Sequence, residues 1–240
     1  MQKTRIDVVV ISYAGGEMLD NCLAALGRYR NTVVDLNIIV QQSAQSTPRN
    51  VNAGFGRVTS DWWVLFNDDW EPTQDHWLDV LYRFAVLNDE PESRLGAVCP
   101  RIIFQDGRIN HAGYLISEHG EILNVGMGLD SNDTKFTTDF IDYVHPVLNN
   151  STVFRELGGY DARTFVGSQF ADVDYAYRCG SSYRVLYVDE VVLVHNHRCD
   201  ESTKGPRNHG RMVNSDRFRR KHGFPVMNNG VIRRPRKMKK

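Results

Sequence analysis

The sequence predicts an α/β fold in which helices cover both faces of a mostly parallel sheet. Short β-branched runs alternate with helix-length segments of 3.6-residue periodicity, which is typical of doubly wound sheets. The 240 residues are 41% hydrophobic and 24% charged, so the chain can bury a sizeable core. No window approaches the roughly 18 consecutive apolar residues that span a bilayer, so no transmembrane segment is predicted.

The first half alternates strands and helices in a regular order. Apolar runs predict four strands, and the periodicity between them predicts three helices, the first of which follows a turn at Ala14-Gly15-Gly16. In order, the predicted elements are strand Asp7–Ser12, helix Glu17–Tyr29, strand Leu36–Val40, a helix through Val58, strand Trp62–Phe66, helix His76–Leu87 and strand Gly96–Cys99.

The second half is less regular. Asp106-Gly107 separates two apolar runs within Arg101–Ser117, which predicts a hairpin. Glycine-rich sequence follows to about Asp139. The remaining predicted elements are an apolar segment at Val147–Phe154, a helix near Ala171–Cys179, strands within Tyr183–His195 and a last helix near His209–His222.

The charge is distributed unevenly although the formal net charge is zero. Residues 204–240 contain thirteen Lys or Arg and one acid, whereas the first 203 residues contain sixteen basic and twenty-eight acidic side chains. The basic C-terminal tail, residues 224–240, is predicted to be flexible and to attract a polyanion. An anionic membrane, DNA or the acidic body of the protein are the open alternatives, beside a solvated tail without function.

The cysteines and the N-terminus both indicate a cytoplasmic protein. The N-terminal apolar run is short and predicts a core strand better than a signal peptide. The cysteines show no metal-finger spacing and are expected to be free thiols in a reducing compartment. They are Cys22, Cys99, Cys179 and Cys199.

Two neighbouring acids, Asp68 and Asp69, end the third predicted strand. Adjacent carboxylates at the tip of a buried strand repel each other and lose hydration, so they need a compensating positive charge. A hard divalent cation with oxygen ligands is the usual solution, and it is often shared with substrate phosphates. A solvated turn is the alternative. In doubly wound sheets, ligands bind at the carboxyl ends of the strands, where these acids lie.

An ordered set of motifs extends along the chain. Each is weak alone, but together they resemble the family-2 glycosyltransferases of bacteria and phages, which are inverting nucleotide-sugar enzymes with the GT-A fold. The resemblance covers about Ile6 to Gly223. The motifs are Ser12-Tyr13, Asn52-Ala53-Gly54, Asn67-Asp68-Asp69, residues 105–113 (QDGRINHAG), Leu157-Gly158-Gly159-Tyr160-Asp161, Phe170-Ala171-Asp172-Val173-Asp174-Tyr175 and Val194-His195-Asn196-His197.

The resemblance implies a metal site. Asp69 would coordinate Mn²⁺ or Mg²⁺ that bridges the donor diphosphate, and Asp68 would contact the ribose or support the metal. His195 would be a further metal ligand, with a structural imidazole at His195 or His197 as the alternative.

The resemblance also implies the donor contacts. Ser12 and Tyr13 occupy the turn that contacts the base, and Gln42 lies where relatives have an acidic residue, which leaves UDP and dTDP both open. Asn52 and Gly54 match the Asn-x-Gly of the family, although Gly54 can equally be a helix-packing glycine.

The resemblance implies that Asp172, which matches the Asp of the family's Glu-Asp motif, is the general base. Inversion requires a carboxylate that accepts the proton of the acceptor hydroxyl. Ala171 stands where relatives have Glu. Asp174 is expected mainly to pair with Arg178 along the helix. The predicted acceptor-side residues are Trp70, His111 and Asp174, with core packing as the alternative for Trp70.

The predicted function is therefore metal-dependent, inverting transfer of a sugar from a UDP- or dTDP-sugar to a hydroxyl of a saccharide or lipid-linked glycan. Residues 1–100 would bind the nucleotide-sugar, and residues 101–223 would bind the acceptor and provide the base. One alternative is the same chemistry on a hydroxylated base of DNA, motivated by the basic tail. Another is a sugar-nucleotide or glycan-binding module without activity, motivated by Ala171.

Overall fold

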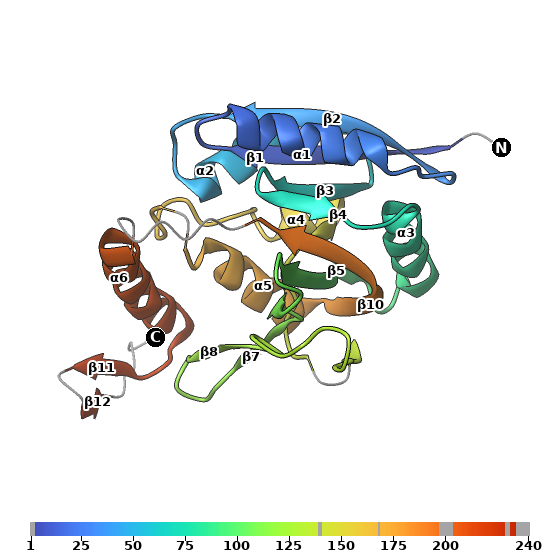
Figure 1. Ribbon diagram of the computed structural model, residues 1–240. Helices are drawn as coiled ribbons and strands as arrows, with labels where there is room; N and C mark the ends of the chain where they lie inside the picture. The colour runs from blue at the N-terminus through green and yellow to red at the C-terminus, as the bar shows by residue number, and fades with distance from the viewer. Residues whose placement is uncertain (1–2, 139–140, 168, 197–203, 229–230, 234–240) are drawn as a thin grey trace.

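The computed structural model describes residues 3–138, 141–167, 169–196, 204–228 and 231–233. They form an α/β structure around an eight-stranded sheet (Figure 1). The strand order is β2-β1-β3-β9-β5-β10-β4, and β6 pairs with β5. The strands are β1 (Thr4–Ser12), β2 (Val34–Gln42), β3 (Trp62–Asn67), β4 (Trp70–Pro72), β5 (Leu95–Phe104), β6 (Ile109–His111), β9 (Leu148–Asn150) and β10 (Arg184–His195).

The sheet contains two parallel groups that are joined by an antiparallel strand. β1 runs parallel to β2 and β3, and β5 runs parallel to β10. The three-residue β9 lies between the groups, antiparallel to both β3 and β5. β4 pairs antiparallel with the end of β10. The prediction of a mostly parallel, doubly wound sheet is confirmed.

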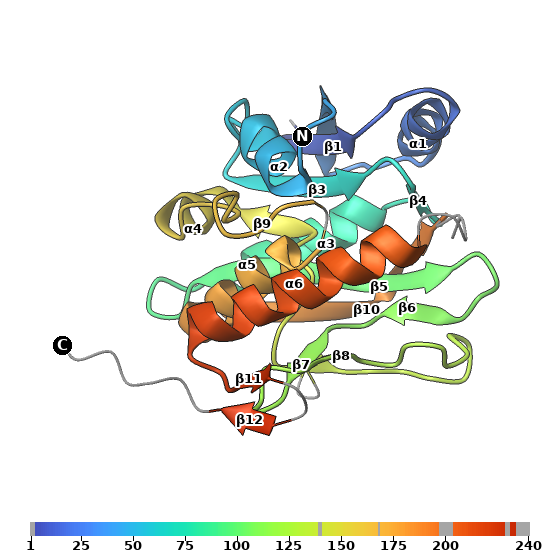
Figure 2. The same ribbon diagram turned by 90° about the vertical axis from the view of Figure 1, so that its left-hand side faces the viewer.

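Six helices are described: α1 (Glu17–Arg28), α2 (Thr47–Phe55), α3 (Trp77–Asn88), α4 (Ser151–Glu156), α5 (Ala171–Ser182) and α6 (Lys204–His222). The ring of Phe154 contacts those of Phe55 and Tyr175, and α2, α4 and α5 lie on one face of the sheet (Figure 2). The backbone N–H of His76, just before α3, donates to the carbonyl of Arg30, just after α1. These two helices lie on the other face, as the right-handed crossovers of a doubly wound sheet require.

The close packing of α2 on β1 depends on Gly54. A Cβ at this position would lie 2.4 Å from Cγ1 of Val9, which is far inside van der Waals contact. Gly54 is therefore required for helix packing, and its predicted place beside the donor stays a prediction. α2 ends at Phe55, earlier than the predicted Val58, because a turn at Gly56 and Arg57 follows the helix.

The second half adds small antiparallel units to the main sheet. β5 and β6 form the hairpin predicted at Asp106-Gly107, and Gly107 adopts a φ of 83° in its turn. Two further pairs lie at the bottom of Figure 1. They are β7 (Tyr114–Ile116) with β8 (Ile122–Asn124) and β11 (Val226–Asn228) with β12 (Val231–Arg233).

β11 and β12 lie within the range predicted as the basic tail, and residues 234–240 lie outside the described residues. The part of the tail that precedes them packs on the body. Phe224 contacts Gly120, where a Cβ would lie 2.7 Å from the phenyl ring.

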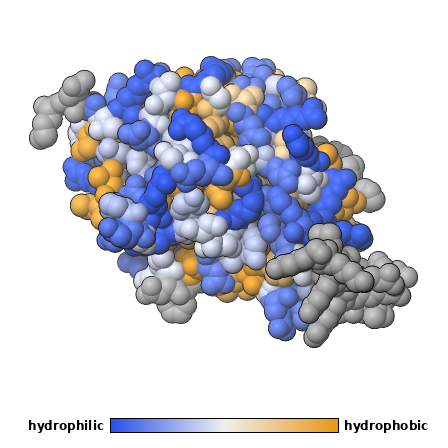
Figure 3. Space-filling model, turned by 180° about the vertical axis from the view of Figure 1, so that it is seen from behind, coloured by the Kyte–Doolittle hydropathy of each residue, from blue (hydrophilic) through white to orange (hydrophobic). Residues whose placement is uncertain are grey.

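On the face shown in Figure 3, hydrophobic residues form small groups separated by hydrophilic ones. Within the described ranges, none of the helices combines the length and apolar character that crossing a bilayer would require. Cys22, Cys99 and Cys179 are buried free thiols, as predicted, and Cys199 lies outside the described residues.

Candidate active site

The paired acids lie at the carboxyl end of β3, where the chain turns into β4. Because β4 pairs antiparallel with β10, Trp70 lies opposite His195 in the register. This pairing brings Asp69 and His195 together across 126 residues of sequence, with Nε2 of His195 2.9 Å from Oδ2 of Asp69. The structure therefore places side by side the two residues that the sequence predicts as metal ligands.

The other ring nitrogen of His195, Nδ1, forms a hydrogen bond that orients the ring. Nδ1 lies 3.0 Å from Oδ1 of Asn110. An amide oxygen can only accept, so Nδ1 bears the proton and donates it to Asn110. Histidines that bind metals are commonly oriented by such a bond. In the neutral ring, the Nε2 lone pair then faces the carboxylate of Asp69, and two acceptors at this distance repel each other unless they share a proton or would both bind one cation.

A second observation, besides the contact with His195, indicates that Asp69 lacks a partner. Its Oδ1 is buried and has no hydrogen-bond partner within the described part of the chain. A buried carboxylate oxygen without a partner is costly, and a cation would remove that cost. One carboxylate and one imidazole thus fit a divalent cation.

The two side chains do not form a complete metal site by themselves. Among the described residues there is no group of three or more His, Cys, Asp or Glu side chains that could hold a metal ion. His197, the alternative ligand, lies outside the described residues. Further ligands would therefore come from a substrate, from water or from residues outside the described ranges.

Asp68 lies at the edge of a small, acidic hollow. Burial raises the pKa of Asp68, a hydrogen bond from Ser12 opposes this shift, and the charge of Asp69 adds to it. The hollow has a volume of about 230 Å³ and exposes carboxylate and amide groups that favour a cation. It is lined by Glu17, Met18, Asn21, Asp68, Asp69, Glu71, Gln105 and Asn196.

The ends of β1 and β2 form a turn beside this hollow. Ser12 is fully buried, and its hydroxyl accepts a hydrogen bond of 2.9 Å from the N–H of Gly15. Nε2 of Gln42 donates to the carbonyl of Ala14 at 3.2 Å. Tyr13, between them, has 67% of its surface exposed. Ser12 and Gln42 therefore support the turn, and Tyr13 presents its ring to solvent.

The contacts of Asn52 are internal to the protein. Its Nδ2 donates to the carbonyl of Tyr160 at 2.8 Å, and its Oδ1 accepts from the N–H of the same residue at 2.9 Å. The amide joins α2 to the turn at Gly158-Gly159. One N–H and one oxygen lone pair of Asn52 remain, so the predicted contact with the nucleotide-sugar stays a prediction.

Asp172 lies in the first turn of α5, where the helix dipole stabilises a carboxylate. Its side chain is 29% exposed and so remains accessible. The preceding Phe170 adopts a left-handed φ of 68°, which is rare for a bulky residue and costs on the order of 1–3 kcal/mol. Its ring packs on Phe218 of α6, so α6 helps to hold the turn that positions Asp172.

Tyr114 and His145 contact Asp172, and sequence reasoning missed both. The hydroxyl of Tyr114 lies 3.3 Å from Oδ2 of Asp172, and Nδ1 of His145 lies 3.6 Å from the same oxygen. Neither residue belongs to a motif of the resemblance. The only available signal is one of position: Tyr114 directly follows the Asn110-His111-Ala112-Gly113 stretch at the end of one motif.

Trp70 joins the two parts of the site. Its ring centroid lies 5.3 Å from that of His145 and 6.2 Å from that of His195. Asp69 and Asp172 are thus connected through three adjacent rings at one end of the molecule. Trp70 is only 3% exposed, so it forms the floor of the site instead of presenting a face to an acceptor.

His111 is also buried beneath the site. It is 5% exposed, its ring lies 4.1 Å from that of Tyr114, and its Nδ1 accepts from the N–H of Gly113 at 2.8 Å. Burial lowers the pKa of His111 well below its usual value, and the charge of His145 adds to this shift. His111 supports Tyr114 from below.

Asp174 anchors α6 to α5. It is completely buried, and Arg178 contacts it at 2.9 Å, as the i,i+4 spacing predicts. Lys221 and His222 at the end of α6 contact its other oxygen at 2.7 and 2.8 Å. Asp174 therefore has a structural environment and no access to an acceptor.

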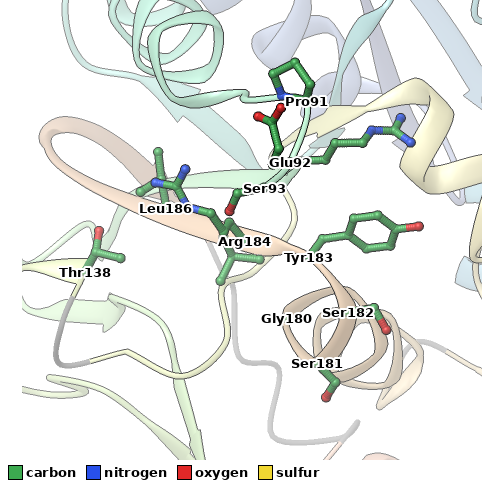
Figure 4. A pocket seen from close by; sticks show the side chains of 12 residues that line it. Pro91, Glu92, Ser93, Thr138, Gly180, Ser181, Ser182, Tyr183, Arg184 and Leu186 are labelled. Atoms are coloured by element: carbon green, nitrogen blue, oxygen red, sulfur yellow. The ribbon is translucent and has the colours of Figure 1, made fainter.

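A larger hollow lies elsewhere on the described structure. It has a volume of about 790 Å³ and is formed where α5 ends and β10 begins, beside the loop at Pro91 (Figure 4). His195 lies at the opposite end of β10. Because ligands of doubly wound sheets bind at the carboxyl ends of the strands, we place the candidate active site at Asp69 and Asp172 and not in this hollow.

Neither a protein-family model nor a curated protein matches the sequence. Among solved structures, the chain is similar to GalNAc-T7 crystallised with UDP, GalNAc and Mn²⁺, with a TM-score of 0.61 and 11% identity over 90% of this chain and 47% of that one. It is also similar to S. aureus TarS, with a TM-score of 0.54 and 8% identity over 81% of this chain and 37% of that one. The chain thus spans less than half the length of these structures. Its fold is the GT-A fold of glycosyltransferases.

Proposed function

We propose that the protein is a metal-dependent, inverting glycosyltransferase that moves a sugar from a UDP- or dTDP-sugar to a hydroxyl of a saccharide. The observation that supports this most strongly is the arrangement of Asp69, His195 and Asp172 around shared rings at the carboxyl edge of a GT-A sheet. The structurally similar GalNAc-T7 was crystallised with UDP, GalNAc and Mn²⁺, which supports the donor class and the metal.

The donor would bind where β1 and β3 end. Asp69 and His195 would hold Mn²⁺ or Mg²⁺, and Asp68 would contact the ribose or support these ligands. When bound, the cation neutralises the charge that develops on the departing diphosphate. The exposed ring of Tyr13 would lie against the base. Residues 1–100 would thus bind the donor, and residues 101–223 the acceptor.

Asp172 would act as the general base. Its carboxylate takes the proton from the acceptor hydroxyl while that oxygen attacks the anomeric carbon. The new C–O bond forms on the face opposite the diphosphate, and the bond to the diphosphate breaks with its electron pair. Inversion follows from this single displacement, without a covalent intermediate on the enzyme.

Nucleotide release from a panel of UDP- and dTDP-sugars with Mn²⁺ tests the proposal. We expect the wild-type protein to release nucleotide and Asp69→Asn to lose about 100- to 1,000-fold in rate, because a ligand of the charge-neutralising cation is weakened. Asp133→Asn, which alters an exposed acid outside the site, is the matched control and should retain activity.

Two further measurements separate an enzyme from a binding module. Asp172→Asn should still bind UDP with Mn²⁺ in calorimetry but should not turn over. A wild-type protein that binds UDP and releases nucleotide from no donor would instead be a binding module. Equal rates for Asp69→Asn and the wild type would contradict the proposed metal site.

A further inference from the structure

We propose that Tyr114 and His145 are positioning residues that hold the Asp172 carboxylate by one oxygen and leave the other for the acceptor hydroxyl. This inference rests on the proposed function, in which Asp172 is the base. It assigns a role to two side chains that the sequence motifs do not include.

The contacts form a short relay. The Tyr114 hydroxyl lies 3.3 Å from Oδ2 of Asp172 and 3.2 Å from Nδ1 of His145. Within the described residues, no hydrogen bond reaches Oδ1 of Asp172 from another side chain. The carboxylate is thus held on one side only, and its 29% exposed surface remains open to a ligand.

The direction of each hydrogen bond follows from the donors available. An ionised carboxylate only accepts, so the single proton of the Tyr114 hydroxyl points to Asp172. The oxygen of Tyr114 must then accept from His145, which requires the proton on Nδ1. His145 is therefore the Nδ1–H tautomer, and its Nε2 has the lone pair.

Burial keeps both residues in the protonation states that the relay needs. Tyr114 is 4% exposed, and burial raises its pKa well above its usual value, with the charge of Asp172 adding to the shift. Burial also lowers the pKa of His145; Asp172 opposes this shift and His195 adds to it. The phenol thus remains a donor and the imidazole remains neutral at pH 7.

Orientation is the function that this relay would serve. A carboxylate that rotates freely presents either oxygen to the acceptor, whereas one fixed through Oδ2 presents Oδ1 in a single direction. His145 does not need to touch the substrate for this, because it acts on Asp172 through Tyr114. The packing of His111 on Tyr114 and of Trp70 on His145 restricts both rings.

Steady-state kinetics on the full chain test the relay. We expect Tyr114→Phe to lower kcat about 10- to 100-fold, the effect of one hydrogen bond to a charged group, and to leave the donor KM unchanged. His145→Ala should cause a similar loss, and His145→Asn, which keeps a donor near the Nδ1 position, should recover part of it. Tyr143→Phe, which removes a hydroxyl on a ring that packs against Tyr177 instead, is the matched control.

The double variant Tyr114→Phe/His145→Ala decides whether His145 acts through Tyr114. If it does, the double variant should be no slower than Tyr114→Phe alone. Multiplied losses, or a rise in donor KM equal to the fall in kcat, would overturn the inference.

Histidine ¹⁵N NMR tests the same contacts without turnover. We expect His145 to give the pattern of a neutral Nδ1–H tautomer at pH 7.5 and to shift in Tyr114→Phe but not in Tyr143→Phe. An Nε2–H tautomer in the wild-type protein would overturn the relay. Failure of every donor to turn over, with the Nδ1–H tautomer present, would instead count against the proposed function.

Discussion

Two pairs of aspartates lie at opposite edges of the sheet and differ in how the protein satisfies them. Asp7 and Asp79 are at the amino edge, where loops enter the strands. Asp68 and Asp69 are at the carboxyl edge, where β3 ends. All four are buried or partly buried, so burial alone does not distinguish them.

The amino-edge pair is fully occupied by hydrogen-bond donors. Burial raises the pKa of Asp7, but bonds from Thr59, Ser60 and Asn37 outweigh it and lower the value to about 2. Burial likewise raises the pKa of Asp79, and hydrogen bonds again outweigh it and lower the value to about 2. The donors to Asp79 are the backbone of Thr32, Val33 and Val34 and the ring of His76.

The carboxyl-edge pair has fewer such donors. Burial raises the pKa of Asp68 although Ser12 donates to it, and one buried oxygen of the half-buried Asp69 has no partner among the described residues. Carboxylates saturated by backbone N–H groups thus stabilise the fold, whereas carboxylates left short of positive charge mark the site where a ligand would supply it.

The pH dependence of stability should show the largest effect of this contrast. A carboxyl group whose pKa is lower in the folded than in the unfolded protein stabilises the fold at pH values above the unfolded pKa. This stabilisation is lost as the pH falls through the folded pKa. The stabilisation from Asp7 and Asp79, about 5 kcal/mol together, should therefore be lost between roughly pH 5 and pH 1. Urea unfolding across this range measures it. A double variant Asp7→Asn/Asp79→Asn that keeps the same slope would refute the assignment.

A single substitution at the amino edge should have the next largest effect. Asp7→Asn keeps one oxygen for the N–H groups of Thr59 and Ser60, which both donate to Oδ2 at 2.7 and 3.0 Å. Its NH2 group then faces Nδ2 of Asn37, which donates to Oδ1 at 2.7 Å in the wild-type protein, so that bond is lost. We expect the free energy of unfolding at pH 7 to fall by about 2 to 4 kcal/mol. Asp35→Asn, on the exposed face of β2, is the control and should change it by less than about 0.5 kcal/mol.

At the carboxyl edge, removing a carboxylate should raise the free energy of unfolding instead of lowering it. The pKa of Asp68 is higher in the folded than in the unfolded protein, so the ionised carboxylate destabilises the fold at pH 7. Asp68→Asn should therefore stabilise the metal-free protein at this pH. The gain should vanish near pH 3, where the carboxyl is protonated in both states. Destabilisation at pH 7 would mean that Asp68 belongs with the structural pair.

Local patterns predicted most of the first half of the fold. The apolar runs of β1 and β3 and the 3.6-residue period of α1 are short-range features, because each strand or helix must bury one side of itself. Asp68 and Asp69 were identifiable for the same reason: they end such a run. The sequence does not indicate where β9 ends and α4 begins, because Leu148–Asn150 contains only one apolar residue. This segment becomes a strand because it lies between the two longer strands β3 and β5 and pairs with both.

The α/β class, the hairpin at Asp106-Gly107 and the position of the paired acids could be predicted from local sequence, because turn chemistry and hydrophobic period act over a few residues. The pairing of β4 with β10, the contact of His195 with Asp69 and the contacts of Tyr114 and His145 with Asp172 became visible only in the folded protein. These contacts join residues 27 to 126 positions apart. Strand pairing and burial select such partners only once the whole sheet is assembled, and no local pattern encodes them.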